Sequence, residues 1–329
     1  MTMNCPQCNT VATEGSAFCE ECGTSLAGAV ASSDPSLRCE CGAGPTAIDA
    51  DGFCTQCGAR RVRAPRDHFE EILSVRAAGT SDIGCKYDEN QDYFVMATGP
   101  EGQIVAVVCD GVSRSQNSMV GSKMACEAAL DRIKDLLPEA SDDPNGVLLQ
   151  AMTSAQEAIC RVPFVPNLVE DGEIIPPAQA TAVGVLVVGK RITLGWLGDS
   201  RAYWVGKGAA RQLTVDHSWL NDVVASGQMT EEEAKKDPRA RAIVRSLGAD
   251  NDGANPGVVP DATTLNLTES GILLIVSDGF YTYADEREIA QLVREKGRDA
   301  DALSLSRHLV EHARNSGGSD NITVVAIVF

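Results

Sequence analysis

The sequence contains no long apolar run. None of its runs approaches the ~20 consecutive apolar residues that a membrane-spanning helix needs. The first residues, Met1 to Pro6, also lack the pattern of a secretory signal peptide. We therefore expect a cytoplasmic protein that does not associate with membranes.

Positive charge is also scarce. The chain has 28 Lys and Arg residues against 46 Asp and Glu residues, which gives a formal net charge of −18. Binding to a nucleic-acid backbone needs clustered Lys and Arg that displace counterions from phosphates. The acidic balance therefore argues against nucleic acid as a partner. Bound divalent cations would neutralise part of it locally.

Cysteine, by contrast, is concentrated at one end of the chain. Eight of the twelve cysteines lie in four close pairs within the first 57 residues, and Phe18–Gly23 and Phe53–Gly58 share the pattern Phe-Cys-x-x-Cys-Gly. Each such pair resembles a zinc knuckle, and two knuckles supply the four thiolates of a tetrahedral zinc site. Disulfides are the alternative, but they belong to oxidising compartments.

We therefore predict two structural zinc ions, with the cysteines grouped in chain order. The separation of one residue in the third pair is shorter than usual. Closed four-cysteine sites leave no position open for a substrate, so the modules should be structural or bind a partner protein. The ligands would be Cys5, Cys8, Cys19 and Cys22 in the first ribbon, and Cys39, Cys41, Cys54 and Cys57 in the second.

The length of 329 residues allows one large domain plus small modules, because single cores rarely grow beyond ~250 to 300 residues. The linker before the large domain is basic, and we interpret it as a solvated hinge, with docking on an acidic partner as the alternative. The predicted segments are a zinc ribbon (1–26), a linker (27–36), a second zinc ribbon (37–59), the basic linker (60–68) and the large domain (69–329).

The large domain alternates between strand and helix patterns. Residues 121–137 place apolar side chains at helical spacing and stop at Pro138, and a second helix is predicted over 146–161. Residues 162–180 are rich in proline, so we expect an irregular surface excursion there. A hairpin about Gly189-Lys190 is predicted next.

Acidic residues recur at the ends of the predicted strands. An apolar, β-branched run over 104–109 ends in Asp110-Gly111, and the run 272–276 is followed by Ser277-Asp278-Gly279. If these strands pack in sheets, their acids gather at one mouth and repel each other unless cations neutralise them. Magnesium and manganese prefer such oxygen ligands, and the carbonyl of Gly111 could approach a metal as well. The acids are Asp92, Asp110, Asp199, Asp278 and Asp320.

These motifs resemble, in order, those of the protein phosphatase 2C family of metal-dependent serine/threonine phosphatases. They span roughly Phe69 to Phe329, about four-fifths of the chain. The resemblance implies an α+β fold, a four-layer α-β-β-α sandwich, here preceded by the two zinc ribbons. The matching segments are Asn90–Asp92, Val108–Gly111, Thr181–Val183, Gly198–Tyr203, Leu213–Ser218, Ser277–Gly279 and Gly318–Thr323.

The resemblance also implies a dinuclear site with two to three manganese or magnesium ions. Asp110 would bridge two ions, Asp92 and the Gly111 carbonyl would complete one position, and Asp278 with Asp320 would hold the other. Asp199, with Asp278, matches a third and weaker position. Two cations activate a water molecule and neutralise charge on the phosphoryl group. Asp92, Asp110, Asp278 and Asp320 would thus serve catalysis through metal-bound water, without a cysteine nucleophile.

Two departures from the family pattern concern the substrate phosphate. Tyr87 occupies the position at which the family usually has a phosphate-binding arginine, and the Asp-Gly loop continues over 112–117 without a histidine. Lysine can act as a point charge but cannot make the bidentate contact of arginine. Our hypothesis is that Lys86 or Arg114 binds the phosphate instead.

Two other functions are compatible with parts of the sequence. A catalytically weak phosphatase-like scaffold, with ribbons that bind partners, is the main alternative. His308 and His312 have the spacing of an inverted zinc protease motif, but little chain follows them. The ribbons and the variant loop also resemble bacterial signalling phosphatases, which implies phosphorylated serine/threonine proteins of a kinase pathway as substrates.

Overall fold

The computed structural model describes residues 3–4, 11–12, 42–44, 47, 54–57, 65–297 and 300–329. The chain forms two compact units, Met1–Pro65 and Arg66–Phe329. No helix among the described residues is long and apolar enough to cross a membrane.

In the first unit, β1 (Met3–Asn4) pairs with β2 (Val11–Ala12). Cys54 is buried beside Ala43, and Cys57 is exposed. The zinc sites stay a prediction, because their other ligands lie outside the described residues: Cys5, Cys8, Cys19, Cys22, Cys39 and Cys41.

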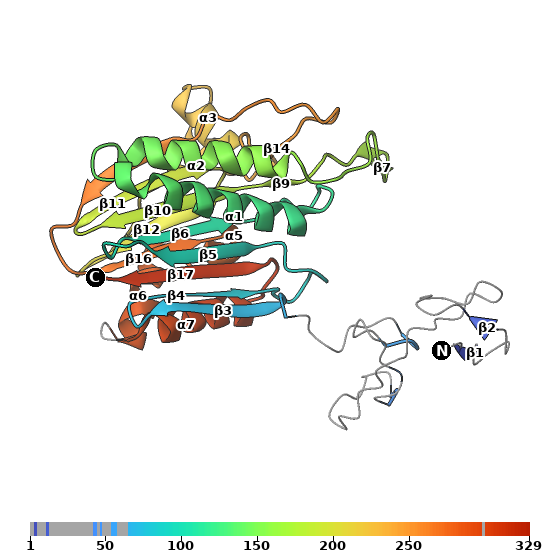
Figure 1. Ribbon diagram of the computed structural model, residues 1–329, viewed down its shortest axis with the longest axis horizontal. Coiled ribbons are helices and arrows are strands. Elements are labelled where there is room, and N and C mark those ends of the chain that lie inside the picture. Colours follow the sequence, from blue (N-terminus) through green and yellow to red (C-terminus); the bar gives the residue numbers. More distant parts are fainter. Residues whose placement is uncertain are drawn as a thin grey trace. The chain divides into compact units, whose positions relative to one another are not determined.

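The second unit is built on two antiparallel sheets (Figure 1). The five-stranded sheet has the order β15 (Asp261–Asn266), β11 (Arg191–Leu197), β10 (Ala182–Val188), β6 (Ile104–Cys109) and β5 (Tyr93–Thr98). The six-stranded sheet has the order β13 (Ala210–Gln212), β12 (Arg201–Val205), β16 (Ile272–Val276), β17 (Ile322–Val328), β4 (Ala77–Asp82) and β3 (His68–Ser74).

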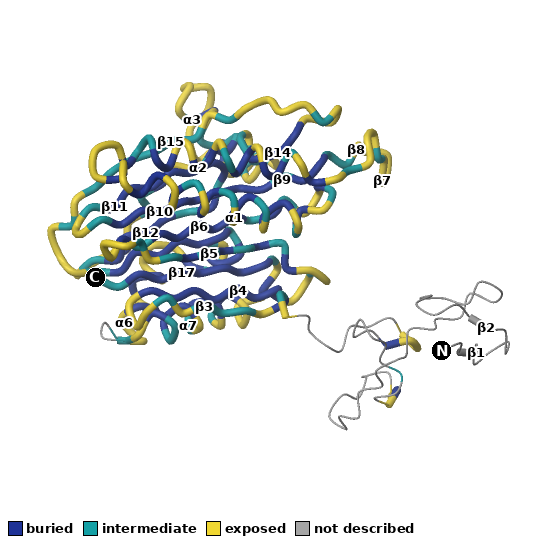
Figure 2. Tube along the Cα trace, viewed as in Figure 1, coloured by how far each residue is buried: buried dark blue, intermediate teal, exposed yellow. Residues whose placement is uncertain are grey.

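Successive side chains of a strand point to opposite faces of the sheet, and here both faces are covered. In β6, Val105 and Val107 pack against helices, whereas Ala106 and Val108 pack in the cluster between the sheets. The helices α1 (Ser118–Leu136) and α2 (Pro144–Ile159) cover the five-stranded sheet. The other sheet is covered by α5 (Asp278–Tyr281), α6 (Glu286–Lys296) and α7 (Ala302–Asn315). The layers are therefore α-β-β-α, as predicted, and Figure 2 shows the buried strands between them.

Shorter elements lie between the strands. The turn η2 (Leu137–Glu139) follows α1. The stretch expected to be irregular contains the hairpin of β7 (Val169–Glu170) and β8 (Glu173–Ile174), and then β9 (Gln179–Ala180). After β13 come α3 (Trp219–Ala225), α4 (Glu231–Ala234) and β14 (Leu247–Gly248), of which β14 pairs with β9.

The second unit begins before the predicted start of the large domain. Asn90 donates its side-chain N–H to the carbonyl of Arg66 (3.0 Å), and the backbone N–H of Ile83 donates to the carbonyl of Asp67 (2.7 Å). Asp67 is buried. Residues 66–67 are therefore tied to the chain that leads into β5.

Helix α2 packs on two glycines that face each other across β10 and β11. Gly184 pairs with Gly195 in register. A Cβ atom on Gly195 would lie 2.8 Å from the Cβ of Leu148, closer than real side-chain carbons come. The absent side chains thus let the helix approach the sheet.

We expect Gly195→Val to destabilise the fold by about 1–3 kcal/mol, because it overpacks this contact. Chemical unfolding followed by circular dichroism measures the change. Gly208→Val is the matched control, since a Cβ there meets no atom within 4 Å. Equal unfolding free energies for the two variants would contradict this account of the packing.

Candidate metal centre

The fold brings the five predicted acids to one end of the sandwich. Asp110 follows β6 and Asp278 follows β16, whereas Asp92 and Asp320 precede β5 and β17. Asp199 lies between β11 and β12. The strands are antiparallel, so ends and starts of neighbouring strands meet at one edge. The charges of the other four carboxylates all raise the pKa of Asp110, after the larger effect of burial.

Burial and mutual repulsion disfavour the charged forms of these acids. Burial is the main cause that raises the pKa of Asp92 to about 6 and that of Asp278 to about 8. For Asp278 the neighbouring charges of Asp320 and Asp199 add to this effect. The pKa of Asp199 is raised to about 6, again chiefly by burial. Such a group of acids at one mouth is typical of a cation site.

Asp92 shows best how a cation fits. Its Oδ2 accepts hydrogen bonds from the hydroxyls of Ser277 (2.7 Å) and Thr323 (2.8 Å). Its Oδ1 is buried and has no hydrogen-bond partner among the residues that the structure describes. A buried carboxylate oxygen without a partner is costly, and a hard cation is the ligand that would satisfy it. The donor set of carboxylates and a carbonyl fits magnesium or manganese.

Glycines next to the acids allow close backbone approach. A Cβ on Gly111 would lie 2.8 Å from the carbonyl oxygen of Gln91. At Gly279 a Cβ would collide with the carbonyl oxygen of Asn321. The backbone after Asp110 therefore lies against the segment that carries Asp92, and the backbone after Asp278 lies against the segment that carries Asp320.

The described side chains do not form a closed metal cage. No group of three or more His, Cys, Asp or Glu side chains within 65–297 and 300–329 has the spacing for one. Two observations link the five acids. The charges of the other four raise the pKa of Asp110, and all five stand at the ends or starts of strands. The protease alternative gains no support, since no third ligand accompanies His308 and His312 on α7 among the described residues.

Arg66 contacts the candidate site, and the sequence analysis did not single it out. Its guanidinium donates to the carbonyl of Asp92 (3.2 Å) and to the hydroxyl of Ser122 (3.0 Å), and it lies 4.6 Å above the ring of Tyr93. Ser122 in turn donates to the carbonyl of Gln91 (2.5 Å). Arg66 thus holds the carbonyl of Asp92 directly and the carbonyl of Gln91 through Ser122. Its position in a basic linker gave no signal of this role.

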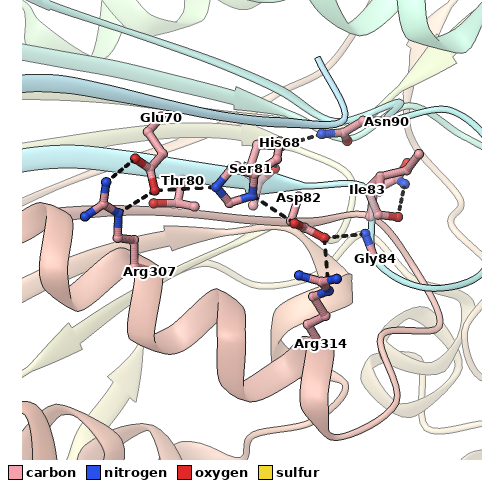
Figure 3. Close-up of polar contacts among 12 residues, drawn as sticks. His68, Glu70, Thr80, Ser81, Asp82, Ile83, Gly84, Asn90, Arg307 and Arg314 are labelled. Atoms are coloured by element: carbon pink, nitrogen blue, oxygen red, sulfur yellow. Dashed lines mark hydrogen bonds and ion pairs between the residues drawn. The ribbon is translucent and has the colours of Figure 1, made fainter. Parts of the chain in front are cut away.

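A second polar network, on the side of the six-stranded sheet, holds the loop that runs from β4 to Asp92 (Figure 3). His68 Nδ1 contacts Asp82 Oδ2 at 2.8 Å, and Asp82 Oδ1 accepts the backbone N–H of Gly84 (2.9 Å). Arg314 on α7 approaches the same carboxylate at 3.8 Å. Asn90 donates to the hydroxyl of Ser81 at 2.9 Å. These contacts fix the loop from β4 to Asp92 at both of its ends.

His217 supports the turn that carries Asp199. Its backbone N–H donates to the carbonyl of Gly198 (2.9 Å), and its Nδ1 lies 3.1 Å from the backbone nitrogen of Gly198, which donates to it. Burial lowers the pKa of His217, which keeps the ring neutral so that Nδ1 can accept. Tyr281 donates to Asp199 Oδ2 at 3.3 Å.

The two predicted phosphate-binding residues differ in their surroundings. Burial raises the pKa of Asp320, and the positive charge of Lys86 acts in the opposite direction on this one acid. Lys86 also lies 4.7 Å above the ring of Tyr87. Arg114 instead forms an ion pair with Glu173 (2.8 Å), and both side chains are exposed.

A cleft of about 650 Å³ opens beside the acids. Its lining includes Asp199 and Asp278, together with Lys235 and Arg241 from the chain that follows α4. The size is suitable for a peptide side chain with its phosphate.

A family model described as Protein phosphatase 2C matches residues 79–312. The chain belongs to the protein phosphatase 2C family. Serine/threonine phosphatase stp of Listeria monocytogenes is 25% identical over 254 residues, which cover 77% of this chain and 95% of that protein. Protein phosphatase PhpP of Streptococcus pneumoniae is 27% identical over 252 residues, 75% of this chain and 94% of PhpP.

Solved structures give the same result. The serine/threonine phosphatase PstP/Ppp of Mycobacterium tuberculosis superposes with a TM-score of 0.61 at 26% identity, over 77% of this chain and 97% of that one. A structure of the PstP catalytic domain in complex with two manganese ions has a TM-score of 0.58 at 25% identity, over 77% and 97%. This chain is therefore a protein phosphatase by family and by fold.

We expect Arg66→Ala to raise the manganese concentration for half-maximal activity about tenfold, with little change in kcat at saturating metal, because Asp92 loses its support. Arg66→Lys should recover part of the affinity, since an ammonium also donates hydrogen bonds. A manganese titration of phosphatase activity measures both. Arg287→Ala, at an exposed position of α6, is the control. An unchanged manganese dependence in Arg66→Ala would refute the assigned role.

The raised pKa values also predict how the metal-depleted protein responds to pH. A carboxyl whose pKa is higher in the folded than in the unfolded chain stabilises the fold fully below its unfolded pKa. This stability is lost as the pH rises through about 6 for Asp92 and about 8 for Asp278.

We therefore expect Asp110→Asn to raise the Tm of the metal-depleted protein by about 2–6 °C at pH 8, and by less at pH 5. The variant removes one repelling charge. Added manganese should raise the Tm of the wild type more than that of the variant. Scanning calorimetry at both pH values provides the comparison, and a lower Tm of the variant at pH 8 would contradict mutual repulsion.

Proposed function

We propose that this chain hydrolyses phosphoserine and phosphothreonine in proteins at a dinuclear manganese or magnesium site. One observation carries the proposal: Asp92 Oδ1 is buried and has no hydrogen-bond partner within the described part of the chain. Four further acids with raised pKa values surround it. The relatives named as serine/threonine phosphatases, and the PstP structure with two manganese ions, support it.

The proposed ligands follow the strand ends. Asp110, whose charge is coupled to all the other acids, would be shared by two ions. Asp92 and the Gly111 carbonyl would complete one position, and Asp278 with Asp320 would hold the second. Asp199 would contribute to a third position. Ser277 and Thr323 orient Asp92 by occupying Oδ2, which leaves Oδ1 for the cation.

The chemistry is hydrolysis of a phosphoric monoester. When bound, the ions polarise the phosphoryl oxygens and lower the pKa of a water molecule. Water would attack the phosphorus in line, and the serine or threonine oxygen would leave. For the phosphate itself, Lys86 is the better supported of the two candidates, because its charge reaches Asp320, whereas Arg114 is paired with Glu173.

The zinc ions, the partners and the location of the protein are proposed from the sequence alone. Two structural zinc ions in the N-terminal ribbons, a protein partner for those ribbons and substrates from a kinase signalling pathway remain proposals. The close cysteine pairs suit a reducing compartment, so the cytoplasm is the proposed location. Loading with zinc and counting the bound metal by mass spectrometry under native conditions would test the ribbons.

The function is tested by hydrolysis of a phosphothreonine peptide and of p-nitrophenyl phosphate with manganese, magnesium or a chelator. We expect metal-dependent turnover in the intact chain and a loss of at least about 100-fold in the variant Asp110→Asn, Asp278→Asn. The matched control is Asp131→Asn, Asp135→Asn, which removes two exposed acids of α1. In the same assay, Lys86→Ala should raise the KM for the peptide.

Two results would count against the proposal. Turnover that survives the double variant would place the chemistry elsewhere. Metal binding without turnover on either substrate would favour the scaffold with partner-binding ribbons.

A further inference from the structure

Helix α2 carries a buried glutamine that pairs with the backbone of β14. Gln156 is 1% exposed. Its Oε1 accepts the backbone N–H of Gly248 (2.8 Å), and its Nε2 donates to the carbonyl of the same residue (2.8 Å). Nε2 also donates to Asn255 Oδ1 (2.9 Å), which accepts the backbone N–H of Gly257 (2.9 Å) as well. The side-chain amide thus occupies the place that a neighbouring strand would take beside Gly248.

The backbone of Gly248 lies too close to β9 for a side chain. Its φ is 141°, and a Cβ atom there would lie 2.6 Å from the carbonyl oxygen of Ala178. Gly248 stands opposite Gln179 in register, where β14 pairs with β9 (Figure 1). It turns both of its backbone polar groups to Gln156. β14 is therefore held between the side chain of Gln156 and β9.

On its other side, β9 binds the loop that follows Asp110-Gly111. Gln179 turns both of its backbone polar groups toward this loop. Its N–H donates to Ser115 Oγ (3.0 Å), and its carbonyl accepts the N–H of Val112 (2.9 Å). β9 therefore lies between β14 and the loop, and Gln156 reaches the loop through this one strand.

The hydrogen bond of Val112 fixes the direction of the Gly111 carbonyl. This carbonyl and the N–H of Val112 belong to one peptide group, and a planar trans peptide points the two in opposite directions. Because the N–H points to the carbonyl of Gln179, the Gly111 carbonyl points away from β9. The preceding peptide is held as well, since the N–H of Thr181 donates to the carbonyl of Asp110 (2.8 Å). β9 thus sets the direction of the one backbone oxygen among the proposed metal ligands.

We propose that Gln156 is a positioning residue for the metal centre: by holding β14 it fixes β9, and β9 fixes the Gly111 carbonyl. Without the amide, the buried N–H and carbonyl of Gly248 would lose these partners, which is costly enough to displace β14 or admit water. Ligands that are held by outer contacts bind a cation more tightly, because binding has to order them less. The inference rests on the proposed function and adds to it a residue of α2, a helix that supplies none of the proposed ligands.

Hydrogen exchange in the metal-free protein, followed by mass spectrometry, tests this connection without turnover. Gln156→Met keeps a similar side-chain volume but cannot pair with Gly248. We expect exchange in peptides that cover 110–116 and 178–183 to become about tenfold faster, relative to peptides of β16 and β17 that report global unfolding. The physical reason is that the N–H groups between β9 and the loop would lose their fixed acceptors.

Met152→Ala is the matched control. Met152 is buried on the same helix, one turn before Gln156, and its Cε lies over Gly184 of β10. The variant lowers global stability because it leaves a cavity. It should leave the relative exchange of both peptides unchanged.

Manganese binding, measured by isothermal titration calorimetry, tests the consequence for the metal centre. Gln156→Met should raise the Kd about three- to tenfold, less than the loss of a direct contact to a ligand, because one strand lies between. Gly248→Ala should act in the same direction, since its Cβ would press against β9. Met152→Ala should keep the Kd of the wild type. At saturating manganese, the kcat of Gln156→Met should stay within about twofold of the wild type.

Three results would overturn the positioning role. They are equal relative exchange in Gln156→Met and the wild type, a Kd that neither Gln156→Met nor Gly248→Ala changes, and an equal rise of the Kd in Met152→Ala, which would reduce the effect to lost stability. A chain that binds manganese but hydrolyses no substrate would instead refute the proposed phosphatase function, and the comparison of Kd values would still judge Gln156.

Discussion

Electrostatic repulsion among five carboxylates is the constraint on which the rest of the catalytic unit depends. The strands deliver Asp110 and Asp278 to one mouth, where burial and mutual charge raise their pKa values. An arrangement that weakens the fold in the charged state is retained where a cation makes it favourable. The neighbouring elements serve this arrangement. Ser277 and Thr323 satisfy one oxygen of Asp92, and two sheets packed against helices keep the strand ends in register.

Support for the centre comes from three directions. Arg66 and Ser122 hold the backbone at Gln91 and Asp92 from the side of α1. The network of His68 and Asp82 fixes the loop from the side of the six-stranded sheet (Figure 3). On the far side, His217 and Tyr281 hold Asp199 and the turn before it. Metal ligands that are positioned by such outer contacts keep their geometry, and this preorganisation lowers the cost of binding.

The loop after Gly111 departs from the pattern of the family. Without a histidine or further glycines, the loop after Gly111 uses Gln116 and Asn117 to hold a hairpin instead. Arg114 belongs to that assembly through Glu173. The loop after Gly111 and this hairpin are therefore held together as one unit.

The sequence by itself determined the family through its ordered motifs, and the four layers followed from that resemblance. The five acids could be picked out because they stand at the ends of predicted strands. Apolar strands ending in Asp-Gly, and helices with apolar spacing, are visible in any short window. Helix α1 nevertheless starts at Ser118, three residues before its expected start at 121. The carbonyl of Asn117 accepts the N–H groups of Val120 and Gly121 and so opens the first turn. Only the tertiary structure decided that Arg66 belongs to the metal centre, that Arg114 turns to Glu173 and that residues 162–180 contain a hairpin. Each of these contacts joins residues distant in sequence, and no periodicity or motif records which partner a side chain meets.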